Sequence, residues 1–285
     1  MTSKQQQQAA EEARVRWQVE GRLGHIVFDR PEAANALDSA SGRALAAAID
    51  QAVEGVAANR IGALLIRSRG TQFCAGGDIR EFVARRDDLD RLIADMLDRL
   101  HPAMQALSTL PVPVVSALQG PVGGAGIAVA LSADLVLAAP QMKLRGGYSA
   151  IGLSPDLGAS WQLVRRAGAA RAKNILMTNR ALSAEQCLAW GIVDELHPAE
   201  ALGPAAQALA QQLAEGATGA LAGIKRLCDG AAGSDLKAHL ALEREALLRA
   251  ARSADGREGI AAFVEKRAPS FAAHRTTIEA KGSMQ

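Results

Sequence analysis

Two glycine-rich segments of this 285-residue chain carry main-chain N–H groups that could act on a ligand. The first is FCAGGD at 73–78, and the second is GPVGGAG at 120–126. Each follows an apolar run typical of a buried strand and precedes a predicted helix, so its N–H groups lie near a helix N-terminus, which favours negative charge. Glycine has no Cβ, so a ligand carbonyl can approach the main chain. Converging on one oxygen, the segments would form an oxyanion hole; the alternative is that the glycines only make turns.

Nucleotide and metal sites fit the sequence less well. Residues 124–126 begin like a dinucleotide-binding fingerprint, but its third glycine would fall at Val129, and the chain has no Gly-Lys-Ser/Thr segment. The three cysteines, Cys74, Cys187 and Cys228, are odd in number and lack the spacing of metal ligands. They indicate reduced thiols in a cytoplasmic protein, and we expect no metal site and no disulfide framework.

Alternating strands and helices are predicted to position the two segments. Apolar residues alternate with polar ones in the predicted strands and recur at helical spacing in the predicted helices. In chain order we expect a hairpin over 15–28, a helix over 40–56, a strand over 61–66, a helix over 89–100, a strand over 112–118, a short helix over 127–132 and a strand over 134–139. Ser183 with Gln186 begins a further helix that Gly191 ends. From about residue 200 the composition favours helices alone.

Composition and charge exclude several classes of protein. The chain has 32 Lys and Arg residues against 30 Asp and Glu, so the net charge of +2 gives no field suited to nucleic acid. Residues 1–8 are polar and Gln-rich, unlike a signal peptide or a membrane anchor. The apolar stretch 112–139 is interrupted by Pro113, Pro121 and Asp134, which is untypical of a membrane helix. We expect a soluble protein with no nucleic-acid or membrane partner.

Several motifs occur together in this chain: RPEAANAL at 30–37, FCAGGD at 73–78, the segment 113–134, and LSAEQ at 182–186 with WGIVD at 190–194. In these motifs and in their order, roughly residues 14–271 resemble the enoyl-CoA hydratase/isomerase (crotonase) superfamily. The resemblance implies an α/β fold, a crotonase-like spiral of ββα units with a helical C-terminal trimerisation region. Together with the polar N-terminus and the shift in composition near residue 200, it leads us to expect a disordered tail (1–12), a spiral core with the CoA and acyl site (13–200) and a helical C-terminal region (201–285).

The resemblance also assigns residues to the binding of an acyl-CoA substrate. It places the two oxyanion-hole donors on the N–H groups of Gly77 and Ala125. Ala33, Ala75 and Ile79 match main-chain positions that line the pocket for CoA and its adenine. Apart from CoA, which enters as part of the substrate, it implies no cofactor.

A homotrimer or a dimer of trimers is the assembly that the resemblance implies. The segment 258–267 resembles a helix that lends an aromatic and a basic residue to the CoA of a neighbouring subunit. Phe263 and Lys266 would play these roles, since residues three apart share one face of a helix. The alternative is a core ring and a solvated lysine.

The chemistry that follows enolate formation depends on carboxylates. The superfamily's hydratases carry two glutamates at positions that hold Ala128 and Tyr148 here, so the usual pair that activates and delivers water is missing. Asp156 matches an aspartate of the isomerase branch, which removes a proton from the acyl chain and returns it elsewhere. Burial in an apolar pocket raises the pKa of an aspartate toward the range of a base that can also act as an acid. We therefore predict an acyl-CoA double-bond isomerase, with enoyl-CoA hydratase-type chemistry as an alternative.

Asp156, Tyr148 and His101 each have other interpretations. Asp156 follows Ser154 and Pro155, so it could instead cap the N-terminus of a helix running through Trp161. The Tyr148 hydroxyl could orient Asp156 or the acyl group, or the ring could simply form the pocket wall.

His101, Tyr148 and Asp156 together correspond to a histidine, an aromatic residue and a nucleophilic aspartate in 4-chlorobenzoyl-CoA dehalogenase, so hydrolysis of that type is a second alternative. We expect His101 instead to be a partly buried residue at a helix end. A further alternative is an acyl-CoA-binding protein without catalysis, because both glutamates are missing.

Overall fold

A computed structural model describes residues 14–271 of the chain. The predicted tail at 1–12 lies outside the described residues, as do residues 272–285 of the predicted helical region. No helix among residues 14–271 is long and apolar enough to cross a membrane.

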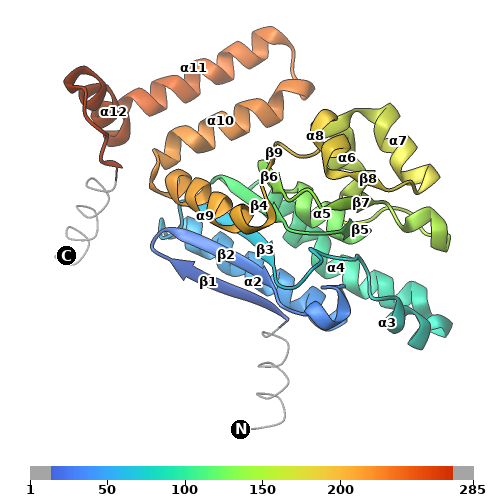
Figure 1. Ribbon diagram of the computed structural model, residues 1–285. Helices are drawn as coiled ribbons and strands as arrows, with labels where there is room; N and C mark the ends of the chain where they lie inside the picture. Colours follow the sequence, from blue (N-terminus) through green and yellow to red (C-terminus); the bar gives the residue numbers. More distant parts are fainter. Residues whose placement is uncertain (1–13, 272–285) are drawn as a thin grey trace.

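A six-stranded sheet forms the centre of the protein (Figure 1). Its strands, in spatial order, are β1 (Val15–Glu20), β2 (Leu23–Phe28), β3 (Ala63–Ser68), β4 (Val114–Leu118), β6 (Leu135–Ala138) and β9 (Glu195–Leu196). The first two strands pair antiparallel, which confirms the predicted hairpin, and the remaining pairs are parallel. Parallel strands end at the same edge of a sheet, so the loops that follow β3 and β4 are brought together there.

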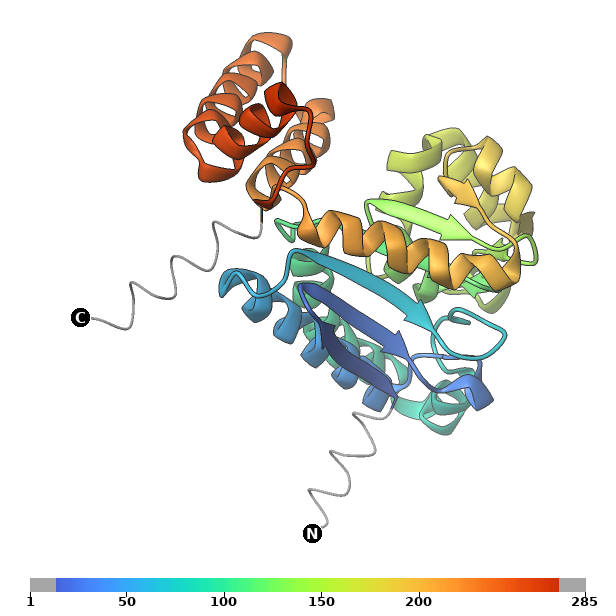
Figure 2. The same cartoon turned by 60° about the vertical axis from the view of Figure 1, so that its left-hand side comes forward.

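Helices cover both faces of this sheet. One face packs against α2 (Ser39–Ala57), α4 (Leu89–Ser108) and α5 (Ala125–Leu131), and the other packs against α9 (Ala199–Glu215), as Figure 2 shows for α2 and α9. Side chains alternate along β3, where Leu64 and Ile66 face the α2 side and Ala63 and Leu65 face α9. Helix α9 begins at Ala199 and packs on the sheet, so part of the predicted helical region beyond residue 200 belongs to the core.

A smaller sheet lies next to the larger one and carries the loops of the candidate site. It consists of β5 (Val122–Gly123), β7 (Lys143–Arg145) and β8 (Leu182–Ser183). The helices around it are α6 (Ala159–Ala167), α7 (Ala169–Thr178) and α8 (Ala184–Ala189), whereas α3 (Ile79–Ala84), which follows the first glycine-rich loop, lies next to α4 (Figure 1). Helix α8 begins with the predicted capping box, in which the Ser183 hydroxyl accepts a hydrogen bond from the Gln186 N–H at 3.2 Å and the Gln186 side chain accepts one from the Ser183 N–H.

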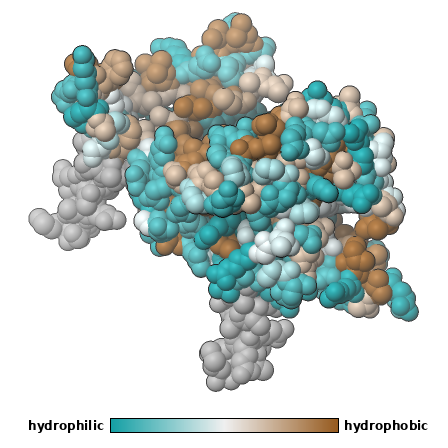
Figure 3. Space-filling model, viewed as in Figure 1, coloured by the Kyte–Doolittle hydropathy of each residue, from teal (hydrophilic) through white to brown (hydrophobic). Residues whose placement is uncertain are grey.

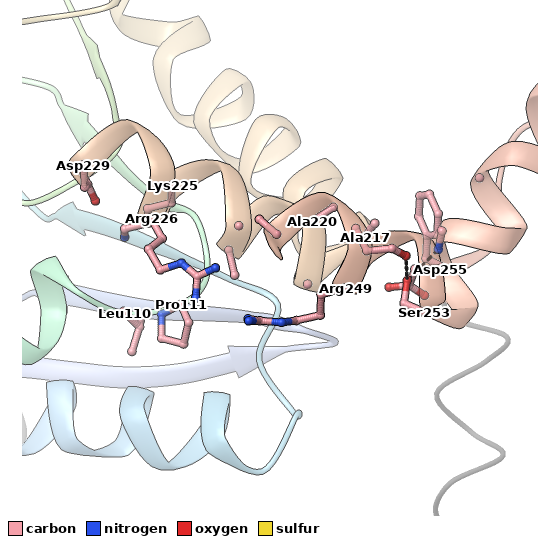
Figure 4. Close-up of a pocket in the computed structure, with 18 of the residues that line it drawn as sticks. Leu110, Pro111, Ala217, Ala220, Lys225, Arg226, Asp229, Arg249, Ser253 and Asp255 are labelled. Carbon is pink, nitrogen blue, oxygen red and sulfur yellow. Dashed lines mark hydrogen bonds between the residues drawn. The ribbon is translucent and has the colours of Figure 1, made fainter. Parts of the chain in front are cut away.

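The last three helices form an arm that extends from the core (Figures 1 and 2). They are α10 (Thr218–Gly230), α11 (Leu236–Arg252) and α12 (Ala254–Glu265). Two ion pairs attach α10 to the core, Lys225 with Asp134 at 3.0 Å and Asp229 with Arg165 at 2.7 Å. A cavity of about 780 Å³ lies between α10, α11, α12 and the segment before β4 (Figure 4), and residues of the two glycine-rich loops do not line it.

Candidate active site

The two glycine-rich loops meet along their main chains. The Gly123 N–H donates to the Cys74 carbonyl at 2.9 Å, and the Phe73 N–H donates to the Pro121 carbonyl at 3.0 Å. Gly76, with φ +100°, lies so close to the second loop that an added Cβ would be 3.0 Å from the Gly123 carbonyl oxygen. Only glycine fits there without strain, because it combines a positive φ with no side chain. The glycines therefore do more than make turns: they let two loops pack against each other.

Two main-chain donors are left open where the loops meet. Within residues 14–271, neither the Gly77 N–H nor the Ala125 N–H has a hydrogen-bond acceptor. Ala125 is the first residue of α5, and the first N–H groups of a helix have no partner within the helix. The added Cβ on Gly76 would lie 3.3 Å from the Ala125 nitrogen, so the two donors belong to the same small region. This arrangement can bind one negatively charged oxygen.

The residues predicted to contact CoA lie beside the first loop. The Ala75 N–H donates to the Ala34 carbonyl at 3.1 Å, which brings Ala33 next to Ala75. Helix α3 begins with Ile79, whose side chain is 49% exposed and thus accessible to a ligand.

Asn35 and Arg30, which sequence reasoning did not identify, hold this arrangement in place. The buried Asn35 side chain donates to the carbonyls of Arg69 and Gln72 and accepts from the Arg30 N–H. Arg30 in turn pairs with Asp78 at 2.8 Å, and Asp78 caps α3. The signal available in the sequence was the RPEAANAL segment itself, which contains both residues.

On the other side of the loops, Tyr148 and Asp156 form a hydrogen-bonded pair. The Tyr148 hydroxyl donates to Asp156 Oδ1 at 2.7 Å, and Tyr148 is only 7% exposed. Burial raises the pKa of Asp156 above its ordinary value, although the hydrogen bond from Tyr148 acts in the opposite direction. The pKa of Tyr148 is raised as well, chiefly by burial and then by the charge of Asp156. The Tyr148 hydroxyl therefore keeps its proton and donates it in a hydrogen bond to the Asp156 carboxylate.

The field of Asp156 reaches the first loop. Burial raises the pKa of the Cys74 thiol to about 12, and the charge of Asp156 adds to this effect. The Gly124 N–H, next to Ala125, also donates to the Gly146 carbonyl at 3.1 Å, two residues before the Tyr148 that binds Asp156, so the carboxylate and the two open N–H donors belong to one site. A base next to an oxyanion hole can take a proton from a carbon adjacent to a thioester while the N–H groups hold the charge that develops on the oxygen.

Residues 18–274 match the family described as enoyl-CoA hydratase/isomerase. The chain belongs to this family. It is 36% identical to a 1,2-epoxyphenylacetyl-CoA isomerase of Escherichia coli over 89% of this chain and 96% of the relative. It is 34% identical to a "Probable enoyl-CoA hydratase" of Rhodobacter capsulatus over 90% of this chain and 97% of the relative. An enoyl-CoA hydratase structure from Polaromonas sp. JS666 superposes with a TM-score of 0.83 at 34% identity, covering 90% of this chain and 98% of that one.

Membership of the family confirms the predicted fold class and an enzyme of the enoyl-CoA hydratase/isomerase type. Of the two positions at which the resemblance led us to expect glutamates, one holds Ala128, which is fully buried in α5, and the other holds Tyr148. Neither side chain can act as an acid–base carboxylate.

The alternative role of Asp156 as a helix cap is wrong. Helix α6 begins at Ala159, and its N-cap is Gly158 with φ +92° and no capping side chain. Leu157 also has a positive φ, so the chain turns between Asp156 and the helix. The side chain of Asp156 is thereby directed to Tyr148 rather than to the first N–H groups of α6.

His101 also differs from its predicted setting at a helix end. It lies within α4 and is exposed, because the helix continues past Pro102 and buries Ala103, Met104 and Leu107 against the core. A positive charge on His101 lowers the pKa of Asp156, so the two residues interact electrostatically.

Phe263 and Lys266 do not share a helical face. Helix α12 ends at Glu265, and Lys266 follows in the left-handed conformation with φ +54°. Phe263 is 85% exposed, so it is not a core ring. Both residues lie on the arm, away from the oxyanion loops of their own chain (Figure 1).

Proposed function

We propose that this chain is an acyl-CoA double-bond isomerase in which Asp156 shuttles the proton. The observation that carries the proposal is the half-buried carboxylate of Asp156, which the Tyr148 hydroxyl holds at 2.7 Å, in one site with two open main-chain donors. Asp156 removes a proton from C2 of a 3-enoyl thioester. The negative charge spreads to the thioester oxygen, which accepts hydrogen bonds from the N–H groups of Gly77 and Ala125. Asp156 then returns the proton to C4, giving the 2-enoyl thioester with no net change in atoms.

Isomerisation suits this site better than hydration does. Adding water needs one group to activate the water and another to deliver a proton, whereas a shuttle needs one carboxylate near a delocalised dienolate. The buried Ala128 removes one of the two usual carboxylates. The raised pKa of Asp156 suits a group that must accept a proton and release it again. The proposed reaction requires no cofactor beyond the CoA of the substrate.

We also propose that the enzyme works as a homotrimer, alone or paired into a dimer of trimers. The arm exposes large apolar side chains that a partner subunit could cover (Figure 3): Ile224, Leu236, Leu240, Leu242, Leu247, Leu248, Ile260, Phe263 and Val264. In such an assembly Phe263 and Lys266 would reach the CoA of a neighbouring subunit, close to that subunit's Ala33, Ala75 and Ile79.

Incubation with 3-enoyl-CoA substrates in deuterated buffer tests the reaction. The expected product is the conjugated 2-enoyl-CoA. Its C4 carries the hydrogen removed from C2, and deuterium replaces that hydrogen only in turnovers in which the Asp156 carboxyl proton exchanges with solvent before it is returned. Asp156→Asn should reduce turnover by at least about 100-fold, because general acid–base catalysis of this kind contributes roughly 100- to 10000-fold. Asp50→Asn is the matched control, since Asp50 is exposed on α2 and should leave turnover unchanged.

Three outcomes would contradict the proposal. Undiminished isomerisation by Asp156→Asn would exclude the assigned base. A 3-hydroxyacyl-CoA product formed from 2-enoyl-CoA, without isomerisation, would identify a hydratase. Tight acyl-CoA binding with neither isomerisation nor deuterium entering the acyl chain would identify a binding protein without catalysis.

A further inference from the structure

Asn179 ends α7 in a conformation that few side chains adopt. It is the C-cap of this helix, with φ +51° in the left-handed region. Glycine is the usual residue in this conformation, and asparagine is the common substitute. Unlike glycine, asparagine adds an amide that can form hydrogen bonds of its own.

Both the side chain and the main chain of Asn179 bind the segment that follows β7. Asn179 Oδ1 accepts a hydrogen bond from the Gly147 N–H at 2.8 Å. The Asn179 carbonyl accepts one from Arg145 Nε at 3.0 Å. Both ends of the segment 145–147 are therefore attached to the same residue, although Asn179 lies more than 30 positions further along the chain.

This segment connects the two halves of the active site. The Gly124 N–H donates to the carbonyls of Arg145 at 3.3 Å and Gly146 at 3.1 Å, and Gly124 immediately precedes the oxyanion donor Ala125. At the other end, Gly147 immediately precedes Tyr148, which binds Asp156. A shift of the segment would move the second oxyanion loop and the partner of the base together.

We propose that Asn179 is a positioning residue, whose side-chain hydrogen bond to the Gly147 N–H sets the second oxyanion loop and the Tyr148–Asp156 pair relative to each other. The proposal rests on the isomerase function proposed above. Asn179 acts through the main chain at 145–147 rather than on the substrate. It should therefore affect the chemical step more than the binding of the thioester.

Asn179→Gly removes the side-chain hydrogen bond but keeps the backbone conformation at position 179. Glycine adopts the positive φ without strain but cannot accept the Gly147 N–H. We expect kcat for isomerisation to fall roughly 10- to 100-fold with little change in KM, because small misplacements of catalytic groups cost rates of this size. We also expect the acidic limb of the kcat–pH profile to move to higher pH, because a weaker bond from Tyr148 leaves the pKa of Asp156 higher.

Two further variants complete the experiment. Asn179→Asp keeps an oxygen that can accept the Gly147 N–H and should restore most of kcat. Asn59→Gly is the matched control, because Asn59 also has a positive φ of +56° and follows a helix, but its hydrogen bonds are to Arg22 on the surface. It should leave kcat and the pH profile unchanged.

Hydrogen exchange of the Gly147 amide, followed by NMR in the unliganded protein, tests the contact independently of the reaction. Faster exchange in Asn179→Gly than in the unmodified protein supports the contact, and unchanged exchange overturns the proposal. Faster exchange with unchanged kcat also overturns it, while leaving the isomerase function intact. An unmodified protein without isomerase activity would instead refute the proposed function, and the exchange rate would still decide whether Asn179 holds the segment.

Discussion

Asp156 is subject to opposing influences from its neighbours. Burial disfavours its charged form and raises its pKa, whereas the hydrogen bond from Tyr148 and a positive charge on His101 favour the carboxylate and lower the pKa. The net direction is upward. Since a base must be ionised to accept a proton, we expect isomerase activity to fall as the pH drops through this raised pKa.

Tyr148→Phe distinguishes orientation of Asp156 from a role as pocket wall. Phenylalanine keeps the ring but removes the hydrogen bond to the carboxylate, so the pKa of Asp156 should rise further. A hydrogen bond to a charged group contributes about 1.5–3 kcal/mol, which corresponds to about one pH unit or more. We expect the acidic limb of the kcat–pH profile to move upward by about that amount. A profile identical to that of the unmodified enzyme would assign Tyr148 to the pocket wall alone.

At the scale of the elements, the oxyanion site depends on how closely two loops can pack. One is the loop that follows β3, and the other is the loop between β4 and α5. Parallel β3 and β4 direct both loops to the same edge of the sheet, and α5 begins at one of the donors. The close approach requires main chain against main chain, as at Gly76 and Gly123. An ordinary side chain at this contact would separate the two N–H groups.

Gly76→Ala should therefore damage the site more than the fold. The added Cβ would lie 3.0 Å from the Gly123 carbonyl, and alanine at φ +100° is strained, which costs about 1–3 kcal/mol of stability. Displacing one oxyanion donor typically reduces the rate by about 100- to 1000-fold. Thermal unfolding and kcat measure the two effects.

Gly203→Ala is the control for this substitution, because a Cβ on Gly203 in α9 would meet nothing within 4 Å. It should leave kcat unchanged and raise stability by about 0.5–1 kcal/mol. Activity retained in Gly76→Ala would show that the loops can separate without loss of the oxyanion site.

At the scale of the whole molecule, the arm does not bury most of its own large apolar side chains. Helix α11 has no buried residue, and α12 buries only Ala262. Leu236, Leu240 and Leu247 share one face of α11 and are 72%, 52% and 71% exposed. Burying such a face against another subunit is favourable by roughly 25 cal/mol per Å² of apolar surface.

Leu240→Asp combined with Leu247→Asp tests the proposed trimer. Charges on this face would oppose its burial, so we expect light scattering to show dissociation toward monomers. Because Phe263 and Lys266 would then no longer reach a neighbouring CoA, KM for acyl-CoA should rise. Ala238→Asp, an exposed position on the opposite face of α11, is the control and should leave the mass unchanged. A monomeric unmodified protein would contradict the trimer.

Local patterns in the sequence were sufficient to predict most of the core. The alternation in residues 15–28, the apolar spacing in 40–56 and the capping box at Ser183 each depend on neighbours in the chain, and the structure has all three. The two glycine-rich loops and Asp156 could also be identified as candidates, because their residue types restrict the chemistry available. The resemblance to the family joined these candidates into one site, because the motifs occur in the same order as in the family.

Contacts between distant segments were decided only by the tertiary structure. The helix cap at Gly158, the exposure of His101 and the end of α12 before Lys266 all depend on how the chain packs or turns beyond the local pattern. The same holds for the hydrogen bond between Asn179 and Gly147, which joins residues 32 positions apart. Residue types and spacing determine which groups can act, but only packing determines which of them meet.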